Sequence, residues 1–256
     1  MSRKFWTTDA RHILWIVVVA LSSTACADNS TISDYHDAPS NVLFVGNSFI
    51  YYNNSLHNHY RALVRSSEFK FDTQPVMRSM TISGAHLPEH AAGLPSMLAT
   101  EDWDVVILQG HSRGPISEAT AEPFRKAARD YSTLVREHDA QPVFFMTWAY
   151  TGKPEMTSQL DTAYTEIGRE LGAQVVPVGL AFATVTDARP DIALRIADAM
   201  HPTLAGTYLA ACTFFAALFN QSPEGLEYSA GLDKKDAAYL QGVAWQTVLS
   251  YQNRDL

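Results

Sequence analysis

The sequence predicts a single α/β domain of three layers, with helices on both faces of a mainly parallel sheet. Short, unbroken apolar runs alternate along the chain with longer segments whose apolar residues recur at helical spacing. The runs lie at residues 42–45, 105–108, 142–148 and 175–178. Unbroken apolar runs are typical of strands that are buried on both faces of a parallel sheet. No internal stretch rich in Pro, Gly and Ser suggests a domain boundary, and 256 residues suit one sizeable domain.

The remaining elements follow from their own patterns. Residues 49–64 carry Leu56, Tyr60 and Leu63 at helical spacing and predict the first helix. Residues 69–80 alternate only partly and contain Pro75, which favours a strand at the edge of the sheet. Further helices are expected over residues 119–137, 157–171, 180–185 (a short one), 204–219 and 233–251.

The first 26 residues have the pattern of an export signal. Basic residues precede an apolar run over 13–21, and small residues then lead to Cys26. Nine apolar residues are too few to span a bilayer. Two processing routes stay open: 23–26 (Ser-Thr-Ala-Cys) resembles a bacterial lipobox, in which Cys26 would be lipidated, whereas 25–27 also fits ordinary signal cleavage. We expect an exported protein, either a periplasmic or cell-surface lipoprotein or a secreted one, with residues 27–40 as a tether before a domain over 41–256.

Charge and cysteine content restrict the partners. Removal of residues 1–26 changes the formal net charge from −8 to −10, because it takes away Arg3, Lys4, Arg11 and Asp9. No cluster of Lys and Arg remains, so nucleic acid and anionic membrane surfaces are poor partners, and a lipid on Cys26 would be the only link to a membrane. Cys212 is the second of only two cysteines and lies on an apolar helical stripe, which favours a buried, inert thiol over a disulfide.

Ser48 follows the first buried strand directly, in the sequence Gly46-Asn47-Ser48. A glycine at this point allows a sharp turn and a close approach of the backbone to other groups. The carboxyl ends of strands in open α/β sheets are where such folds bind ligands. We therefore predict that Ser48 is a nucleophile.

Asp198 and His201 supply the groups that such a serine needs. Pro202 disfavours a helical conformation for His201, so the pair is expected in a loop. There the carboxylate can hold one imidazole nitrogen while the other removes the proton of a serine hydroxyl. Taken alone, the same spacing also describes an aspartate that caps a turn beside a surface histidine.

Acyl transfer also requires hydrogen-bond donors aimed at the oxyanion. The Ser48 amide, the Gly84 amide and the side-chain amide of Gln109 are three candidates. Each of the last two has a simpler interpretation, since Gly84 could be only a turn residue and Gln109 only a polar strand end.

Taken together, four blocks resemble those of the SGNH (GDSL-like) hydrolases: Gly46-Asn47-Ser48, Ser83-Gly84, Gln109-Gly110 and Asp198-x-x-His201. The resemblance extends over residues 41–220. It implies a three-layer α/β/α fold with Ser48 as nucleophile, His201 as base and Asp198 as the residue that orients it. It further implies an oxyanion hole made by the amides of Ser48 and Gly84 and by one side-chain amide.

The third block departs from the usual family pattern. Gln109-Gly110-His111-Ser112 stands where Gly-x-Asn-Asp is usual, and it resembles the Gln-Gly-Glu-Ser of the carbohydrate acetylesterase branch, with His111 in place of Glu. In that branch the glutamine amide completes the oxyanion hole, so the resemblance implies this role for Gln109.

Other polar and aromatic residues near the four blocks are candidates for substrate contact, namely Asn47, His86, His111 and Trp148. Residues 51–54 (Tyr-Tyr-Asn-Asn) could form a rim with Trp148, or equally could be core or loop residues. The histidines lack a diagnostic metal-ligand spacing, and neither a metal nor a cofactor is expected.

The sequence thus favours a serine esterase that removes small acyl groups, with acetyl groups on carbohydrates as one candidate and a small-molecule or carbohydrate ester as substrate. Two alternatives use the same crevice. One is a non-catalytic lipoprotein that binds a glycan or peptide, and the other is an acyltransferase.

Overall fold

The computed structural model describes residues 1–2 and 38–255, and the account below concerns residues 38–255, which lie in one compact unit. The predicted export signal, Cys26 and most of the predicted tether lie outside the described residues. Within the described part of the chain, no helix is long and apolar enough to cross a membrane.

Five parallel strands form the sheet in the order β2-β1-β3-β4-β5. This order confirms the predicted fold class and the edge position of the second strand. The strands are β1 (Asn41–Gly46), β2 (Val76–Thr81), β3 (Val105–Leu108), β4 (Gln141–Phe145) and β5 (Gln174–Val176).

Three predicted strands end or begin elsewhere than the sequence suggests. Strand β2 begins only after Pro75, and β4 ends at Phe145, before the predicted end at Trp148. Strand β5 ends before Pro177, which cannot donate a backbone hydrogen bond and is the N-cap of the next helix. Apolar side chains continue past these ends because the following loops are buried too, so the apolar pattern alone does not mark where pairing stops.

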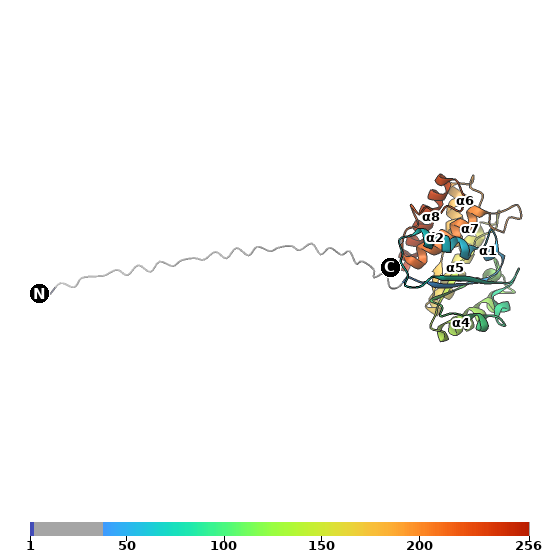
Figure 1. Ribbon diagram of the computed structural model, residues 1–256, viewed down its shortest axis with the longest axis horizontal. Helices are drawn as coiled ribbons and strands as arrows, with labels where there is room; N and C mark the ends of the chain where they lie inside the picture. The colour runs from blue at the N-terminus through green and yellow to red at the C-terminus, as the bar shows by residue number, and fades with distance from the viewer. Residues whose placement is uncertain (3–37, 256) are drawn as a thin grey trace. The chain divides into compact units, whose positions relative to one another are not determined.

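Helices cover both faces of the sheet, with α4 on one side and α2 and α7 on the other (Figure 1). Their bounds are α1 (Ser48–Tyr51), α2 (Leu56–Ser66), α3 (Leu94–Leu98), α4 (Ala121–Glu137), α5 (Glu155–Leu171), α6 (Val178–Ala188), α7 (Leu204–Phe219) and α8 (Lys234–Gln252). Short 3-10 turns lie at Leu87–His90, Gly114–Ile116 and Asn253–Asp255.

The predicted helix over residues 49–64 is in fact two helices, α1 and α2. Between them Asn53, Asn54 and Ser55 have φ angles of 51°, 67° and 66°, in the left-handed region. Such angles are unfavourable for non-glycine residues and cannot continue a right-handed helix, so the chain turns here.

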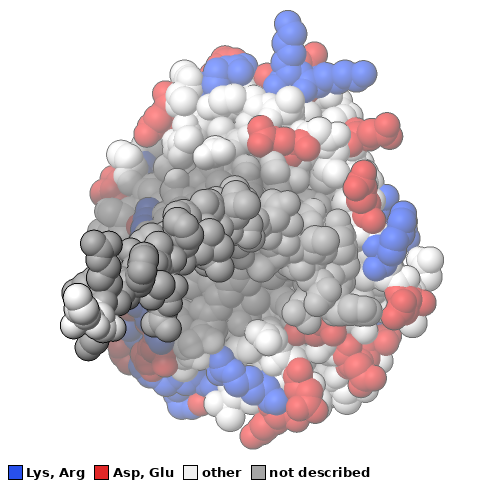
Figure 2. All heavy atoms as spheres, turned by 90° about the vertical axis from the view of Figure 1, so that its left-hand side faces the viewer, with Lys and Arg blue, Asp and Glu red and all other residues white. Residues whose placement is uncertain are grey.

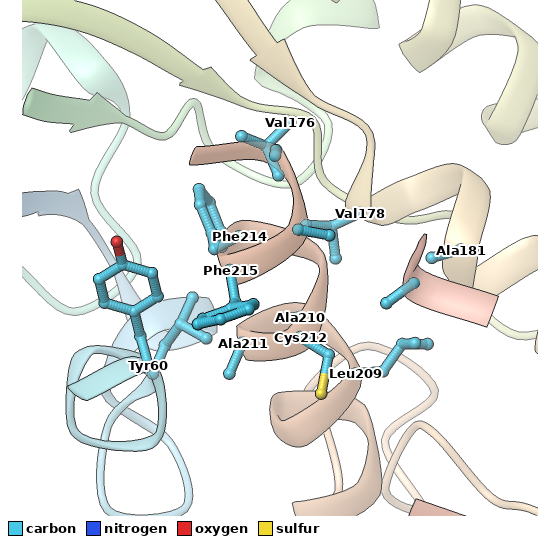
Figure 3. Packing of buried hydrophobic residues seen from close by; sticks show 14 of the residues in the cluster. Tyr60, Val176, Val178, Ala181, Leu209, Ala210, Ala211, Cys212, Phe214 and Phe215 are labelled. Atoms are coloured by element: carbon cyan, nitrogen blue, oxygen red, sulfur yellow. The ribbon is translucent and has the colours of Figure 1, made fainter. Parts of the chain in front are cut away.

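Alternate side chains of β1 serve two cores. Val42 and Phe44 pack in the cluster that contains α2, α6, α7 and α8, whereas Leu43 and Val45 pack with α4 and α5. Helix α7 is buried over almost its whole circumference, and Figure 3 shows its aromatic and small side chains packed against neighbouring elements. Cys212 lies on this helix, fully buried, and burial raises the pKa of its thiol, as expected of an inert cysteine.

Charged side chains lie at the surface. On the part visible in Figure 2, Lys and Arg are interspersed with Asp and Glu. Two ion pairs join α4 to α5, Arg125 to Glu166 at 2.9 Å and Arg129 to Glu170 at 2.5 Å. Exposed pairs of this kind contribute little to stability individually.

The sheet register brings the candidate residues to one edge. Gly46 at the end of β1 lies beside Thr81 at the end of β2, and Val45 lies beside Leu108 at the end of β3. The loops that follow these strands carry Ser48, Gly84 and Gln109. The carboxyl edge of the sheet is therefore where the site must be sought.

Candidate active site

Ser48 is the first residue of α1, immediately after β1. Asn47 is the N-cap of this helix, and its Oδ1 accepts a hydrogen bond from the Phe49 amide at 3.1 Å. Gly46 is required sterically, because a Cβ there would lie 2.3 Å from Gln109 Oε1 and 2.7 Å from Ile50 Cδ1. The absence of a side chain at Gly46 thus allows the backbone to pack closely against the side chain of Gln109.

A continuous hydrogen-bond chain joins Ser48, His201 and Asp198. His201 Nε2 lies 2.9 Å from Ser48 Oγ, and His201 Nδ1 lies 2.6 Å from Asp198 Oδ2. The carboxylate can only accept, so Nδ1 carries the proton and Nε2 presents its lone pair to the Ser48 hydroxyl. The three side chains that the sequence singled out separately do converge.

Backbone amides fix the carboxylate of Asp198. Its Oδ1 accepts from the amides of Met200 and His201, both at 2.9 Å. Burial raises the pKa of Asp198, but these amide bonds and the bond from the imidazole outweigh it, so the pKa is lowered on balance. Asp198 therefore stays ionised and holds the imidazole in one tautomer.

The loop that carries the pair is held from outside. Ala199, between Asp198 and Met200, has a φ of 67°, an unusual conformation for a residue with a side chain. Its carbonyl accepts from the Thr151 amide at 3.0 Å, and the Ile196 amide donates to the His201 carbonyl at 2.9 Å. One contact with the segment of Thr151 and one hydrogen bond within the loop thus support the geometry of this turn.

Trp148 supports this loop and does not face the crevice, contrary to the expected substrate contact. Its side chain is fully buried and is stacked between Phe49 and Phe182, with ring centroids 4.3 and 4.1 Å away. Its indole N–H donates to the Met200 carbonyl at 2.9 Å. Because β4 ends at Phe145, the chain turns and places the indole beneath the loop of His201.

Gln109 also differs from its expected role. Its Oε1 accepts from the Asn47 amide at 3.1 Å, and its Nε2 donates to Asn47 Oδ1 and to the Gly110 carbonyl, both at 2.9 Å. The residue is fully buried. Both amide hydrogens are engaged within the protein, so Gln109 offers no free donor to an oxyanion in this structure and instead fixes the turn before Ser48.

Asn47 is a support as well, not the predicted substrate contact. Only 2% of its surface is exposed, and its Nδ2 donates to the Ala85 carbonyl at 2.9 Å. It therefore links the turn after β1 to the loop after β2, which carries Gly84.

The two backbone amides predicted to bind an oxyanion, those of Ser48 and Gly84, have no hydrogen-bond partner among the described residues. The Ser48 amide opens α1, where helical geometry provides no intrahelical acceptor. Gly84 is exposed, with a φ of 66° that a side chain would disfavour, and no atom lies within 4 Å of where its Cβ would be. Because Gly84 is exposed and its surroundings are open, a ligand can reach its backbone amide.

His86 and His111 form a partly exposed pair on the loops after β2 and β3. Their rings stack with centroids 4.3 Å apart and an interplanar angle of 18°. Burial, and then the nearby His86, lower the pKa of His111. In the part of the chain that the structure describes, no group of three or more His, Cys, Asp or Glu side chains could hold a metal ion.

Two residues of the suggested rim contact the histidine loop, which the sequence pattern did not reveal. The Tyr52 ring stacks on the imidazole of His201, with centroids 4.4 Å apart and planes 10° from parallel. The Asn53 side chain donates to the Pro202 carbonyl at 2.9 Å. In the sequence, only the position of Tyr52 and Asn53 shortly after Ser48 indicated that they could lie near the site.

No protein-family model and no curated protein sequence matches this chain, whereas several solved structures share its fold. A DUF4886 family protein from Bacteroides uniformis is 21% identical, with a TM-score of 0.62 over 82% of this chain and 94% of its own. A putative SGNH hydrolase from Slackia heliotrinireducens is 28% identical, with a TM-score of 0.56 over 67% and 94% of the two chains. The acetylxylan esterase Axe2 from Geobacillus stearothermophilus is 15% identical, with a TM-score of 0.57 over 70% and 94%. The chain therefore has the SGNH-hydrolase fold that its four sequence blocks predict, in a form that it shares with acetylxylan esterases.

Proposed function

We propose that this protein is a serine esterase that removes small acyl groups through a covalent acyl-enzyme. The observation that carries the proposal is the hydrogen-bond chain from Asp198 through His201 to Ser48, with separations of 2.6 and 2.9 Å. This arrangement lies at the carboxyl edge of a parallel sheet and contains the nucleophile, base and orienting acid that acyl transfer needs.

In the first half-reaction Ser48 Oγ attacks the ester carbonyl while its proton passes to His201 Nε2. The negative charge that develops on the carbonyl oxygen is stabilised by the amides of Ser48 and Gly84. His201 then donates the proton to the leaving alcohol as the C–O bond breaks. A water molecule, activated by the same imidazole, releases the acyl group in the second half-reaction.

The substrate that we propose is an acetyl ester of a carbohydrate. The fold shared with solved acetylxylan esterases supports this choice. The partly exposed pair of His86 and His111 supplies polar atoms beside the loops that carry Gly84 and Gln109, where they can contact hydroxyl groups of a sugar.

The test is the activity of Ser48→Ala together with labelling by a fluorophosphonate. Wild-type protein should hydrolyse p-nitrophenyl acetate and form an adduct on Ser48, and Ser48→Ala should do neither while remaining folded. Ser132→Ala is the matched control, because Ser132 is buried in α4 and its hydroxyl has no hydrogen-bond partner among the described residues.

Retention of turnover by Ser48→Ala would refute the assignment of the nucleophile. Folded wild-type protein that neither hydrolyses acetyl esters nor reacts with the probe would instead indicate a binding protein. If acetyl transfer to an added alcohol exceeded hydrolysis, the protein would be an acyltransferase with the same residues.

A further inference from the structure

The imidazole of His201 contacts two aromatic side chains, that of Phe49 in the helix that carries Ser48 and that of Tyr52, the C-cap of this helix. The Tyr52 ring lies parallel to it at 4.4 Å, and Phe49 meets it edge to face, with centroids 5.8 Å apart. Asp198 and Ser48 occupy its two nitrogens. Among the ion pairs of the described residues, that of His201 is with Asp198, at 2.6 Å.

The position of Tyr52 is set by an unfavourable backbone conformation. Asn53, Asn54 and Ser55 follow it with three successive φ angles in the left-handed region. Asparagine tolerates this conformation better than most residues, but three successive left-handed residues that include Ser55 need support from other contacts.

Contacts across the site enforce this turn. The Asn53 amide group donates to the Pro202 carbonyl at 2.9 Å and to Thr207 Oγ1 at 2.8 Å. Ser55 Oγ donates to the Ile50 carbonyl at 3.2 Å. Since Pro202 is adjacent to His201, the turn after Tyr52 is joined directly to the loop of the base. The Tyr52 ring and the imidazole therefore keep a fixed relation.

We propose that Tyr52 is a positioning residue that acts through His201, by stabilising the imidazolium that forms when His201 takes the proton of Ser48. The face of an aromatic ring carries a negative potential and attracts a cation placed over it. A neutral imidazole gains less from this contact than an imidazolium. The stabilisation therefore increases as the proton moves, which is what lowers a barrier. This inference rests on the proposed esterase function.

The proton balance of the reaction shows where the contact acts. As the bond from Ser48 Oγ to the carbonyl carbon forms, the hydroxyl proton moves to His201 Nε2, and the carbonyl π electrons move to its oxygen. When the bond to the leaving alcohol breaks, the same proton moves to the alcohol oxygen. The imidazolium exists only between these two events, and again during attack by water, so Tyr52 acts in both half-reactions.

The first test is Tyr52→Leu, which fills the same place with an apolar side chain that has no π face. We expect kcat/KM for p-nitrophenyl acetate to fall about five-fold through kcat, with KM little changed. The acid limb of the pH profile of kcat/KM should move to lower pH by about 0.7 unit, because an imidazolium without the ring loses its proton more readily. Tyr52→Phe keeps the ring, so its kcat/KM should stay within about two-fold of the wild-type value and its acid limb should stay in place.

A matched control and a conservative probe separate this role from packing. Tyr239→Leu makes the same change on α8, away from His201, where the Arg189 guanidinium carbon lies 5.2 Å from the centroid of the Tyr239 ring. This variant should leave kcat/KM and the acid limb of the pH profile unchanged. Substitution of Tyr52 by 4-cyanophenylalanine keeps the shape but weakens the negative face, and should move the acid limb in the same direction as leucine.

An acid limb that stays in place in both the leucine and the cyano variants would overturn the proposal, as would a Tyr52→Phe enzyme as impaired as Tyr52→Leu. An NMR titration of the His201 ring, identified by its loss in His201→Gln, measures the same shift without any turnover. If wild-type protein proved inactive, the esterase assignment would fail, but the titration would still decide whether Tyr52 stabilises the imidazolium.

Discussion

Replacement of Trp148 by phenylalanine separates a supporting role from a role in substrate binding. The change keeps an aromatic ring between Phe49 and Phe182 but removes the indole N–H that donates to the Met200 carbonyl at 2.9 Å. Loss of that hydrogen bond costs about 1 kcal/mol. The net removal of two buried ring carbons costs roughly another 2 kcal/mol, at about 0.8 kcal/mol for each buried carbon group.

The expected loss of unfolding free energy is therefore about 3 kcal/mol, which lowers Tm by roughly 6–12 °C for a domain of this size. Activity should fall too, since the Met200 amide holds Asp198 at 2.9 Å and a loosened Met200 displaces the acid from the base. We expect kcat to fall about ten-fold, because Asp198 would no longer hold His201 in the geometry that proton transfer requires. KM should not change, because Trp148 is fully buried and cannot touch substrate.

Thermal unfolding followed by circular dichroism and steady-state hydrolysis of p-nitrophenyl acetate measure both effects. Trp103→Phe is the matched control: Trp103 is also buried, and its indole N–H donates to the Met97 carbonyl at 3.1 Å, away from the site. It should lose similar stability but keep its kcat. A Trp148→Phe enzyme of unchanged Tm and kcat, or one with a raised KM and normal kcat, would refute the reasoning.

Three further substitutions test the remaining supports. Gln109→Leu should lower the unfolding free energy in urea by about 2–4 kcal/mol, because Asn47 loses both of its hydrogen bonds to Gln109 in the buried turn; full stability with lost activity would instead indicate that Gln109 acts in the oxyanion hole. Ala199→Gly should change stability by less than about 1 kcal/mol, since relief of the left-handed strain is offset by a more flexible unfolded chain, whereas Ala199→Val should be clearly less stable in the same titration. Asp198→Asn should lower kcat about 10³- to 10⁴-fold through the wrong imidazole tautomer. Because the pKa of Asp198 is lowered in the folded state, its contribution to stability is present above the unfolded pKa and is lost as pH falls through the folded pKa; the variant should therefore lose less stability on acidification than wild type, and an identical acid profile would contradict this.

The fold and the convergence of Ser48, Asp198 and His201 could be predicted because each depends on local chemistry. Apolar runs identify strands that are buried on both faces, and parallel strands bring their carboxyl ends to one edge. A residue that follows such a run must lie at that edge whatever the rest of the chain does. His201 lies at the same edge, where it is hydrogen-bonded to Ser48, in the loop before α7 that Pro202 favours.

The direction of individual side chains could not be predicted in the same way. The helical spacing over residues 49–64 continues through Asn53, whose left-handed conformation depends on hydrogen bonds to Pro202 and Thr207, about 150 residues further along the chain. Gln109 follows β3 as expected and Trp148 lies in the loop after β4, but their polar hydrogens are donated to Asn47, Gly110 and Met200. Such pairings are decided only when separate loops meet, so no pattern within one block reveals them.

The distribution of these supports has a chemical consequence. On the side of the base, Trp148, Tyr52 and Asn53 all hold the loop of His201. In the proposed mechanism the oxyanion is bound by the backbone amides of Ser48 and Gly84, because both side-chain amide hydrogens of Gln109 are engaged elsewhere in the described structure. A missing oxyanion donor costs on the order of 3 kcal/mol of transition-state stabilisation. In the proposed esterase mechanism these supports favour efficient proton transfer by His201, and the rate should depend on how readily the leaving alcohol accepts that proton.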